Sequence, residues 1–288
     1  MMDMATMKPD FENSISVYGC TDVGRRRLGN EDAFLVADLA AESGFNVNAS
    51  GHCRDERGSL LVVADGMGGA AAGEIASAMA IATLREALMG IPCEQSAGEE
   101  LKLAVETANE SIWTRAQQDG RLRGMGSTLT AALVQAGVAH ICQVGDSRAY
   151  LIRGERIRQL TKDQSLVQLL VDMGDITPEQ AAHHPQKKVI LQALGAKPTV
   201  KAEMTTVELC RDDYLLLCSD GLSNLVAPAE MQDVVAQSHD LEAACWQLVE
   251  LANGRGGEDN ITVIVARFDG ESLCSSNDKA ITASLRIN

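Results

Sequence analysis

The sequence has 288 residues, of which 45% are hydrophobic and 23% charged, and its formal net charge is -15. This is the composition of an ordinary globular protein, long enough to bury one large hydrophobic core. The excess of acidic residues argues against nucleic acid and anionic membrane surfaces as partners, and it favours cations.

The longest apolar runs, residues 60–64 and 261–266, are far shorter than the roughly 20 residues that cross a bilayer. Residues 1–11 carry two aspartates and lack the apolar centre of a signal peptide. The sequence therefore predicts a cytoplasmic protein. Its eight cysteines include no C-x-x-C pair, so we expect them to be reduced and to act as small hydrophobic side chains.

Both ends of the chain are polar and lack sustained periodicity. We expect residues 1–12 to be a flexible N-terminus, residues 13–269 a single domain and residues 270–288 a flexible tail. Residues 42–58, rich in Gly, Asn and Ser, indicate a surface loop between two strands. Residues 59–64 form an apolar run that stops at Asp65-Gly66, as a buried strand does at a tight turn.

Two amphipathic helices are expected next. Apolar residues recur at helical spacing from Ile75 to about Met89, and again from Leu101 to about Gln118. The pattern then becomes that of strands, over residues 128–135, 138–144 and 149–153, which is typical of a meander.

The remaining elements alternate less regularly. Helices are expected over residues 164–173, 178–183 and 241–252, and strands near Val207 and over residues 214–218 and 261–268. Because helices and strands come in blocks and not in strict alternation, the predicted class is α+β, with helices covering sheets.

Acidic residues stand at the ends of the buried strands. Three apolar runs end at Asp65, Asp146 and Asp220, and Asp259 comes just before the last strand. A single Asp-Gly after a strand is most simply a turn. Several carboxylates in such low-dielectric places would repel one another, so their convergence requires a cation. Ligands that are all oxygen suit Mg²⁺ or Mn²⁺ better than Zn²⁺.

Eight motifs between residues 14 and 269 resemble, in the same order, those of the bacterial type 2C protein phosphatases. They are TDVGRRRLGNEDAF, VVADGMGG, GEIAS, GSTLTAAL, VGDSRAYL, LTKDQS, LLLCSDGL and GEDNITVIV. Each motif alone is weak, but their order and spacing make the resemblance specific. It implies a four-layer αββα sandwich, with two central antiparallel sheets flanked by helices. It also implies metal-dependent hydrolysis of phosphoserine and phosphothreonine in proteins.

The resemblance implies two or three Mn²⁺ or Mg²⁺ ions and assigns their ligands. Asp65 would bridge two ions beside the carbonyl of Gly66, and Asp146 would help Asp220 to hold a third. The full set of implied metal ligands is Glu31, Asp32, Asp65, Gly66, Asp146, Asp220 and Asp259. Within this set, Glu31 is expected to act through water, with Asp32 beside it.

Arg27 stands four residues before Glu31, where the family keeps a phosphate-binding arginine. A guanidinium group can donate two parallel hydrogen bonds to phosphate. Spacing alone does not exclude Arg25 or Arg26. The glycines of GMGG indicate a tight turn, because the lysine of a P-loop is missing. Asn260 is expected to brace Asp259 or the start of the last strand.

The size of the barrier bears on the mechanism. Hydrolysis of a phosphate monoester requires an enzyme to remove more than about 20 kcal/mol. Arg27, as the proposed catalytic arginine, supplies only part of this. Two ions about 3.5 to 4 Å apart, bridged by Asp65, can bind a hydroxide and aim it at phosphorus, so no covalent phosphoenzyme is needed.

Two positions depart from the family pattern. Met67 stands where some relatives carry a histidine, which leaves the acid that protonates the leaving group unassigned. Gln164 replaces the histidine of a DHS motif. It belongs to a segment, from about residue 160 to residue 194, that in the family lies near the site and influences the choice of substrate.

Two other functions are weighed against this one. Cys20 and Arg26 stand at the C-x5-R spacing of cysteine-based phosphatases, although Asp22 would lie inside the phosphate cradle. A catalytically weak phosphoprotein-binding module of the same fold is the other alternative. His183-His184 indicates a loop before Pro185 in preference to a metal site.

The expected partners follow from the proposed activity. They are phosphorylated proteins, either substrates of a serine/threonine kinase or the kinase itself, with no nucleic acid and no membrane. The chain is expected to act as a monomer.

Overall fold

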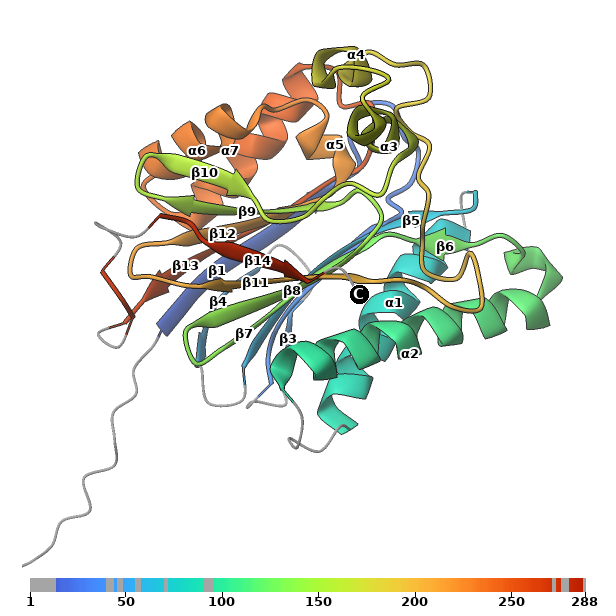
Figure 1. Cartoon of the computed structure of the whole chain (residues 1–288), viewed down its shortest axis with the longest axis horizontal. Helices are drawn as coiled ribbons and strands as arrows, with labels where there is room; N and C mark the ends of the chain where they lie inside the picture. The colour runs from blue at the N-terminus through green and yellow to red at the C-terminus, as the bar shows by residue number, and fades with distance from the viewer. Residues whose placement is uncertain are drawn as a thin grey trace, which may run out of the picture.

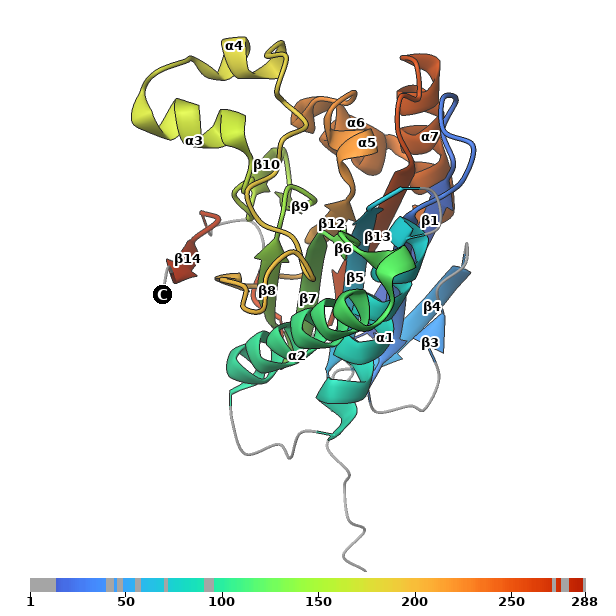
Figure 2. The same ribbon diagram turned by 90° about the vertical axis from the view of Figure 1, so that its right-hand side faces the viewer.

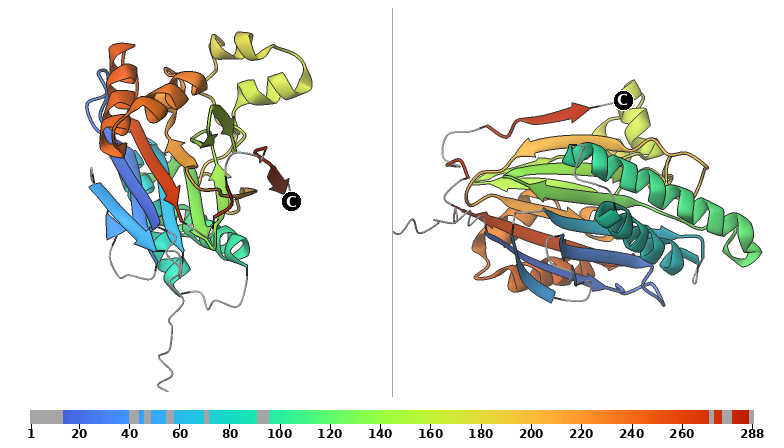
Figure 3. Two further views of the ribbon diagram at one scale, coloured as in Figure 1. Left: turned by 90° about the vertical axis from the view of Figure 1, so that its left-hand side faces the viewer. Right: turned by 90° about the horizontal axis from the view of Figure 1, so that it is seen from below.

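The computed structural model describes residues 14–39, 44–45, 49–54, 58–69, 72–90, 96–270, 273–275 and 280–286. Two antiparallel sheets are stacked face to face, and helices cover the outer face of each sheet (Figure 1). Figure 3 shows this layering from two further sides. The predicted αββα sandwich is confirmed.

The larger sheet runs in the order β14-β11-β8-β7-β5-β2-β3, with β6 paired to β5. Its strands are β2 (Asp32–Asp38), β3 (Gly44–Phe45), β5 (Ser59–Met67), β6 (Gly126–Ser127), β7 (Leu129–Gln135), β8 (Val138–Val144), β11 (Glu203–Glu208) and β14 (Ala283–Arg286). Helices α1 (Ala72–Gly90) and α2 (Ala97–Gln118) pack on its outer face, and a 3-10 turn, η1 (Gly120–Leu122), follows α2.

The smaller sheet runs in the order β10-β9-β12-β13-β1-β4. Its strands are β1 (Ser14–Asp22), β4 (Ala49–Arg54), β9 (Arg148–Arg153), β10 (Arg156–Gln159), β12 (Tyr214–Cys218) and β13 (Ile261–Asp269). Helices α5 (Asp220–Ser223), α6 (Pro228–Gln237) and α7 (Leu241–Gly254) cover the other side of the molecule (Figure 1). Of the described helices, none is both long and apolar enough to cross a membrane.

Helices α3 (Leu166–Met173) and α4 (Pro178–Ala182) project beyond one end of the sheets (Figure 2). We call the segment that contains them, residues 160–194, the flap. Its two arms are joined by backbone hydrogen bonds, from Leu166 N to Val189 O at 2.8 Å and from Leu191 N to Gln164 O at 2.7 Å. The root of the flap is fixed to the body by bonds from Leu160 N to Ala149 O and from Leu194 N to Ser127 O, both of 2.8 Å, while its two helices reach outward.

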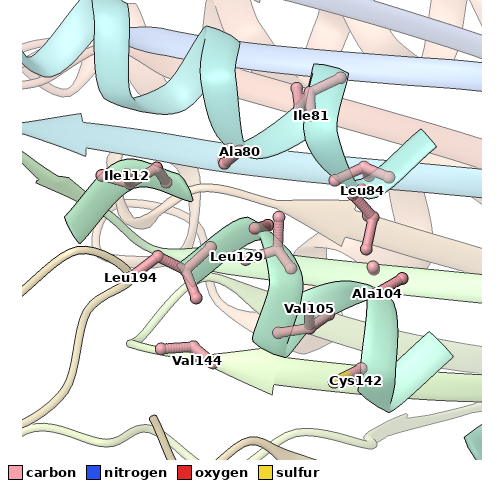
Figure 4. Close-up of a cluster of buried hydrophobic side chains, with 14 of the residues drawn as sticks. Ala80, Ile81, Leu84, Ala104, Val105, Ile112, Leu129, Cys142, Val144 and Leu194 are labelled. Atoms are coloured by element: carbon pink, nitrogen blue, oxygen red, sulfur yellow. The ribbon is translucent and has the colours of Figure 1, made fainter. Parts of the chain in front are cut away.

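Three hydrophobic clusters fill the three spaces between the layers. Strand β5 shows how one strand serves two of them. Leu60 and Val62 face the helices, whereas Leu61 and Val63 face the other sheet, because successive side chains of a strand point to opposite faces. On the helix side, Leu84 and other apolar residues of α1 and α2 meet the sheet (Figure 4).

The space between the sheets changes from apolar to polar along the strands. Asp65 continues the face of Leu61 and Val63 on β5, and Asp32 continues the face of Phe34 on β2. Four more buried polar residues follow apolar residues on the inter-sheet side of other strands in the same way: Thr130, Gln143, Ser219 and Thr262. The inter-sheet layer is thus a hydrophobic core at one end and a buried polar cluster at the other.

Three sequence predictions need correction. The predicted loop over residues 42–58 contains β3 and β4, and β4 pairs with β1. The predicted flexible tail from Gly270 contains β14, which pairs with β11. A disulfide between Cys210 and Cys274 shows that not all cysteines are reduced. Periodicity missed these three strands because each is short and gains its stability from pairing in the folded chain. The predicted N-terminus, residues 1–12, lies outside the described residues.

Candidate active site

The acids at the strand ends come together in a cavity of about 520 Å³ at the polar end of the inter-sheet layer. Arg27 lines it together with six of the seven predicted ligands, which are Glu31, Asp65, Gly66, Asp146, Asp220 and Asp259. Asp32 is buried and does not line the cavity, although no pattern in the sequence separates it from the other six.

Asp65 is fixed by the strands beside it. Its backbone N–H donates to Thr128 Oγ1 at 3.0 Å, and its carbonyl accepts from Thr128 N at 2.8 Å and from Ser127 Oγ at 3.1 Å. Thr128 in turn shares a hydrogen bond of 2.8 Å with the Ser147 hydroxyl. The GST and GDS motifs therefore fix the backbone of Asp65, a role that no local sequence pattern indicates.

Glu31 is placed by contacts from two distant segments. Its backbone N–H donates to Asn260 Oδ1 at 2.9 Å, and Asn260 Nδ2 donates to the carbonyls of Val23 and Gly29 at 3.0 Å each. A Cβ on Gly73 would lie 2.6 Å from Glu31 Oε1, so the space that the carboxylate occupies depends on a glycine. Asn260 thus closes the loop that carries Arg27 and Glu31, in addition to the predicted contact of its N–H with Asp259 Oδ1 at 3.0 Å.

The Asp259 backbone touches the loop that carries Arg27. Gly24 has a φ of 78°, and a Cβ there would lie 2.2 Å from the Asp259 carbonyl oxygen. Arg25 N also donates to Gly257 O at 2.8 Å. The loop from Val23 to Asn30 is thereby held against the start of β13, which brings Arg27 over the cavity.

Asp32 faces Asp65 across the β2–β5 pair. Its Oδ2 accepts hydrogen bonds of 2.7 Å from Ser219 Oγ and from Thr262 Oγ1. Burial raises the pKa of Asp32 to about 7, against the opposing effect of these two hydroxyl groups. Its role as a metal ligand stays a prediction.

Three cavity carboxylates, those of Asp65, Asp146 and Asp220, have raised pKa values. Burial, with repulsion from Asp32 and Asp220 next in size, raises the pKa of Asp65 well above its usual value. Burial raises the pKa of Asp146 to about 7 and that of Asp220 to about 6, and neighbouring carboxylates add to both shifts. A fold that gathers these groups favours their protonated forms unless cations are at hand.

Asp259 is the exception, because two basic side chains contact it. Arg27 forms a fork, with Nε 2.8 Å from Asp259 Oδ1 and Nη2 2.9 Å from Oδ2, and Nη1 lies 3.4 Å from Glu31 Oε2. Lys188 Nζ lies 3.2 Å from Asp259 Oδ2. Burial acts to raise the pKa of Asp259, but the hydrogen bonds and charge of Arg27 outweigh it, and the pKa is lowered.

The comparisons with known proteins agree with one another. A family model for protein phosphatase 2C matches residues 44–252. The chain belongs to the protein phosphatase 2C family. The serine/threonine phosphatase Stp of Listeria innocua is 38% identical over 248 residues, which cover 85% of this chain and 92% of that protein.

Solved structures of 2C phosphatases have the same fold as this member of the family. The Mycobacterium tuberculosis serine/threonine phosphatase PstP/Ppp gives a TM-score of 0.76 at 36% identity, covering 89% of this chain and 99% of that one. A PstP catalytic domain in complex with two manganese ions gives a TM-score of 0.73 at 35% identity, again over 89% of this chain and 99% of that one.

The donor set of this 2C phosphatase fits hard divalent cations. Glu31 Oε1, Asp32 Oδ1 and Asp220 Oδ1 are buried and have no hydrogen-bond partner among the described residues. All the candidate ligand atoms are oxygens, as Mg²⁺ and Mn²⁺ prefer. Within the described ranges, however, no three acidic, His or Cys side chains already surround a single point. Asp259 pairs with Arg27 and Lys188 here, and ligation itself stays a prediction.

The structure decides several alternatives left open by the sequence. Cys20 is fully buried in the core between the smaller sheet and the helices, so the cysteine-based alternative is wrong. Of the three consecutive arginines, Arg27 is the one that pairs with cavity acids among the described residues, namely Glu31 and Asp259. Gly68 and Gly69 have φ values of 127° and 87°, which confirms a turn. His184 Nδ1 accepts from Gln186 N at 3.1 Å, in a loop as predicted.

Gln164 joins the flap to the turn that carries Asp146. Its side-chain oxygen accepts from Gly145 N at 2.9 Å, and its own N–H donates to Gly145 O at 2.9 Å. The side chain is 7% exposed. In this 2C phosphatase the glutamine that replaces the family's histidine therefore acts as a buried link between the flap and the site.

Proposed function

We propose that the chain hydrolyses phosphoserine and phosphothreonine in proteins with the help of two or three Mn²⁺ or Mg²⁺ ions. The observation that carries this proposal is the gathering of buried, mutually repelling carboxylates in one cavity, beneath an arginine fork. Such a cluster is tolerated at neutral pH where divalent cations bind it. The names of the relatives support the choice of phosphoserine and phosphothreonine.

The chain's own residues would divide the work as follows. Asp65, Asp220, Asp259, Glu31 and the Gly66 carbonyl would hold two ions, and Asp146 would join Asp220 at a third. Bound there, the ions would neutralise the phosphoryl oxygens and lower the pKa of the attacking water. These carboxylates come from rigid strand ends, which fixes their positions before the substrate arrives.

Arg27 would bind the phosphoryl group. Its guanidinium already donates two parallel hydrogen bonds to Asp259, and the same fork fits two phosphate oxygens. Because the loop beneath it is held by Asn260 and Gly24, the arginine would orient the phosphorus toward the carboxylate cluster.

Direct attack by water, without a phosphoserine or phosphothreonine on the enzyme, is supported by the residues that line the cavity. Among the described residues that line the cavity, only Thr128 has a side-chain hydroxyl group. That hydroxyl is hydrogen-bonded to Asp65 N and Ser147 Oγ. Met67 also lines the wall and has no proton to donate, so we propose that the leaving oxygen takes its proton from water.

The substrates would be proteins phosphorylated by a serine/threonine kinase, or that kinase itself. The phosphate has to reach the carboxylate cluster through the open side of the cavity, beside the flap. A phosphorylated side chain on a flexible loop or terminus meets this requirement better than one inside a folded domain.

The test is hydrolysis of a phosphoseryl peptide by the EDTA-treated chain as Mn²⁺ is added back. We expect turnover to be absent in EDTA and to return with metal, and a phosphotyrosyl peptide to react more slowly. Acid quenching during turnover of a ³²P-labelled substrate should leave no label on the protein. Absence of turnover at millimolar Mn²⁺ would favour the phosphoprotein-binding module, and label on the protein would contradict direct attack by water.

A further inference from the structure

Two cations from different parts of the chain meet at one oxygen of Asp259. Arg27 Nη2 lies 2.9 Å and Lys188 Nζ 3.2 Å from Asp259 Oδ2. Arg27 belongs to the loop before β2, and Lys188 belongs to the flap. We propose that Lys188 is a second contact for the phosphoryl group of the substrate, in addition to Arg27. This inference rests on the proposed function.

Lys188 comes from the anchored root of the flap. The next residue, Val189, accepts a hydrogen bond from Leu166 N at 2.8 Å, and Ile190 forms a bridge with Ser165. Leu191 N donates to Gln164 O at 2.7 Å, and Gln164 is bonded to the turn of Asp146. The backbone on one side of Lys188 is therefore fixed relative to the site, so the lysine reaches Asp259 from a defined position.

Its side chain faces the cavity and remains accessible. Lys188 lines the same cavity as Arg27 and Asp259, and its side chain is 50% exposed. An ion pair this open contributes little to folding, commonly less than about 1 kcal/mol. A role in holding the fold together therefore does not explain the position of this lysine, whereas a role toward a ligand does.

The geometry suits a phosphoryl group. Arg27 Nη2 and Lys188 Nζ both contact Asp259 Oδ2. The distance between the two nitrogens therefore cannot exceed the sum of their distances to that oxygen. A phosphoryl group presents several oxygens, each able to accept an N–H at about 2.8 Å, so one group can receive hydrogen bonds from both residues. The Asp259 oxygen marks a point that both donors can reach.

Charge supports the same assignment. The chain has a net charge of -15, and five carboxylates line the cavity, which opposes the approach of a phosphate dianion. If Asp259 binds a divalent cation, Arg27 and Lys188 both lose an anionic partner. A phosphoryl group, with a charge of about -1.5 to -2 at neutral pH, can take its place. Lys188 would thus contribute mainly to substrate binding, and the carboxylate cluster to the chemical step.

The experiment compares Lys188→Gln and Lys188→Arg with Lys162→Gln. Lys162 is a matched control, because it also belongs to the flap, is 46% exposed, and pairs with an acid, Asp172, at 2.7 Å. Three quantities are measured with saturating Mn²⁺: KM and kcat for a phosphoseryl peptide, and the inhibition constant of inorganic phosphate.

For Lys188→Gln we expect KM and the phosphate inhibition constant to rise about 10- to 100-fold, as loss of one charge-assisted hydrogen bond predicts, with kcat changed less than about threefold. Lys188→Arg should stay near the wild type, as should Lys162→Gln. Unchanged KM and phosphate inhibition in Lys188→Gln would overturn the inference. So would an equal loss in Lys162→Gln, which would show a general effect of flap charge.

A second measurement separates this inference from the proposed function. Calorimetric titration of inorganic phosphate into the Mn²⁺-treated wild type and Lys188→Gln proteins needs no turnover. Equal phosphate affinity would overturn the role of Lys188 even if the wild type is an active phosphatase. Weaker affinity in the variant would support it even if the wild type fails to hydrolyse the peptide.

Discussion

Asp32 and Asp65 are direct partners across the β2–β5 pair, and both face the space between the two sheets. Two carboxylates in this arrangement oppose folding, since burial raises the pKa of both and the charge of Asp32 further raises the pKa of Asp65. The same end of the layer also contains the hydroxyl groups of Ser219 and Thr262, which bond Asp32. Local conflict of this kind is characteristic of a site maintained for function.

Stability should fall with rising pH in the absence of metal. The raised pKa of Asp32, about 7, means that the folded chain keeps a proton that the unfolded chain releases near pH 4. Asp146 and Asp220, with pKa values of about 7 and about 6, act in the same direction. This stabilising contribution is complete below about pH 4 and is lost as the pH rises through the folded pKa values.

The check is the melting temperature in EDTA from pH 5 to pH 8. We expect it to decrease over that range, to decrease less in Asp32→Asn, and to recover when Mn²⁺ is added. The lowered pKa of Asp259 acts only at more acidic pH, below this window. A melting temperature that increases steadily from pH 5 to pH 8 in EDTA would show that these carboxylates do not dominate.

Asp65→Asn should separate catalysis from folding. We expect kcat/KM to fall at least about 10³-fold, because the central carboxylate of the cluster is lost. The melting temperature in EDTA should be equal or higher, since a buried and repelled charge is removed. Asp233→Asn, on the exposed face of α6, is the matched control and should be fully active. Retained turnover in Asp65→Asn would refute its central role.

Gly73→Ala should disturb Glu31 without breaking α1. The added Cβ would lie 2.6 Å from Glu31 Oε1, so the carboxylate has to move. We expect kcat/KM to fall about 10- to 100-fold and calorimetric Mn²⁺ affinity to weaken, as displacement of a catalytic group by about 1 Å predicts. Gly90→Ala adds the same methyl group in the same helix, where no heavy atom lies within 4 Å. Equal activity of the two variants would mean that Glu31 can be displaced without consequence.

Arg27→Lys should show that the fork matters as well as the charge. A lysine cannot donate two parallel hydrogen bonds from a planar group, so we expect kcat/KM to fall about 10- to 100-fold. Arg25→Lys, two positions earlier, should remain within about threefold of the wild type. Both variants are assayed with the same phosphoseryl peptide, and similar losses would mean that the basic loop acts only through its total charge.

The central acids could be predicted because each marks the end of an apolar run. Asp65, Asp146 and Asp220 interrupt hydrophobic strands, and that signal is local in sequence. Strand alternation also predicts which way Asp65 faces: every second residue of β5 points the same way, so Asp65 lies on the inter-sheet face with Leu61 and Val63. The αββα architecture, by contrast, came from resemblance, since periodicity indicated only the α+β class.

Other features depend on contacts between distant segments, and no local pattern reveals them. Lys188 and Asp259 are 71 residues apart, and nothing in the sequence of the flap indicates that they meet. Asn260 was expected near Asp259, but its side-chain contacts reach back 229 residues to Glu31. The Cys210–Cys274 bond joins residues 64 positions apart, and cysteine spacing does not reveal such pairings.

Strand β14 protects an edge of the larger sheet against aggregation. It lies at the end of the larger sheet, pairs with the six-residue strand β11, and is itself four residues long. The nearby Cys210–Cys274 bond ties its approach to the body. A chain shortened after Asp269 would leave the backbone groups of β11 free to pair with a neighbouring molecule, which is the usual starting point for edge-to-edge aggregation.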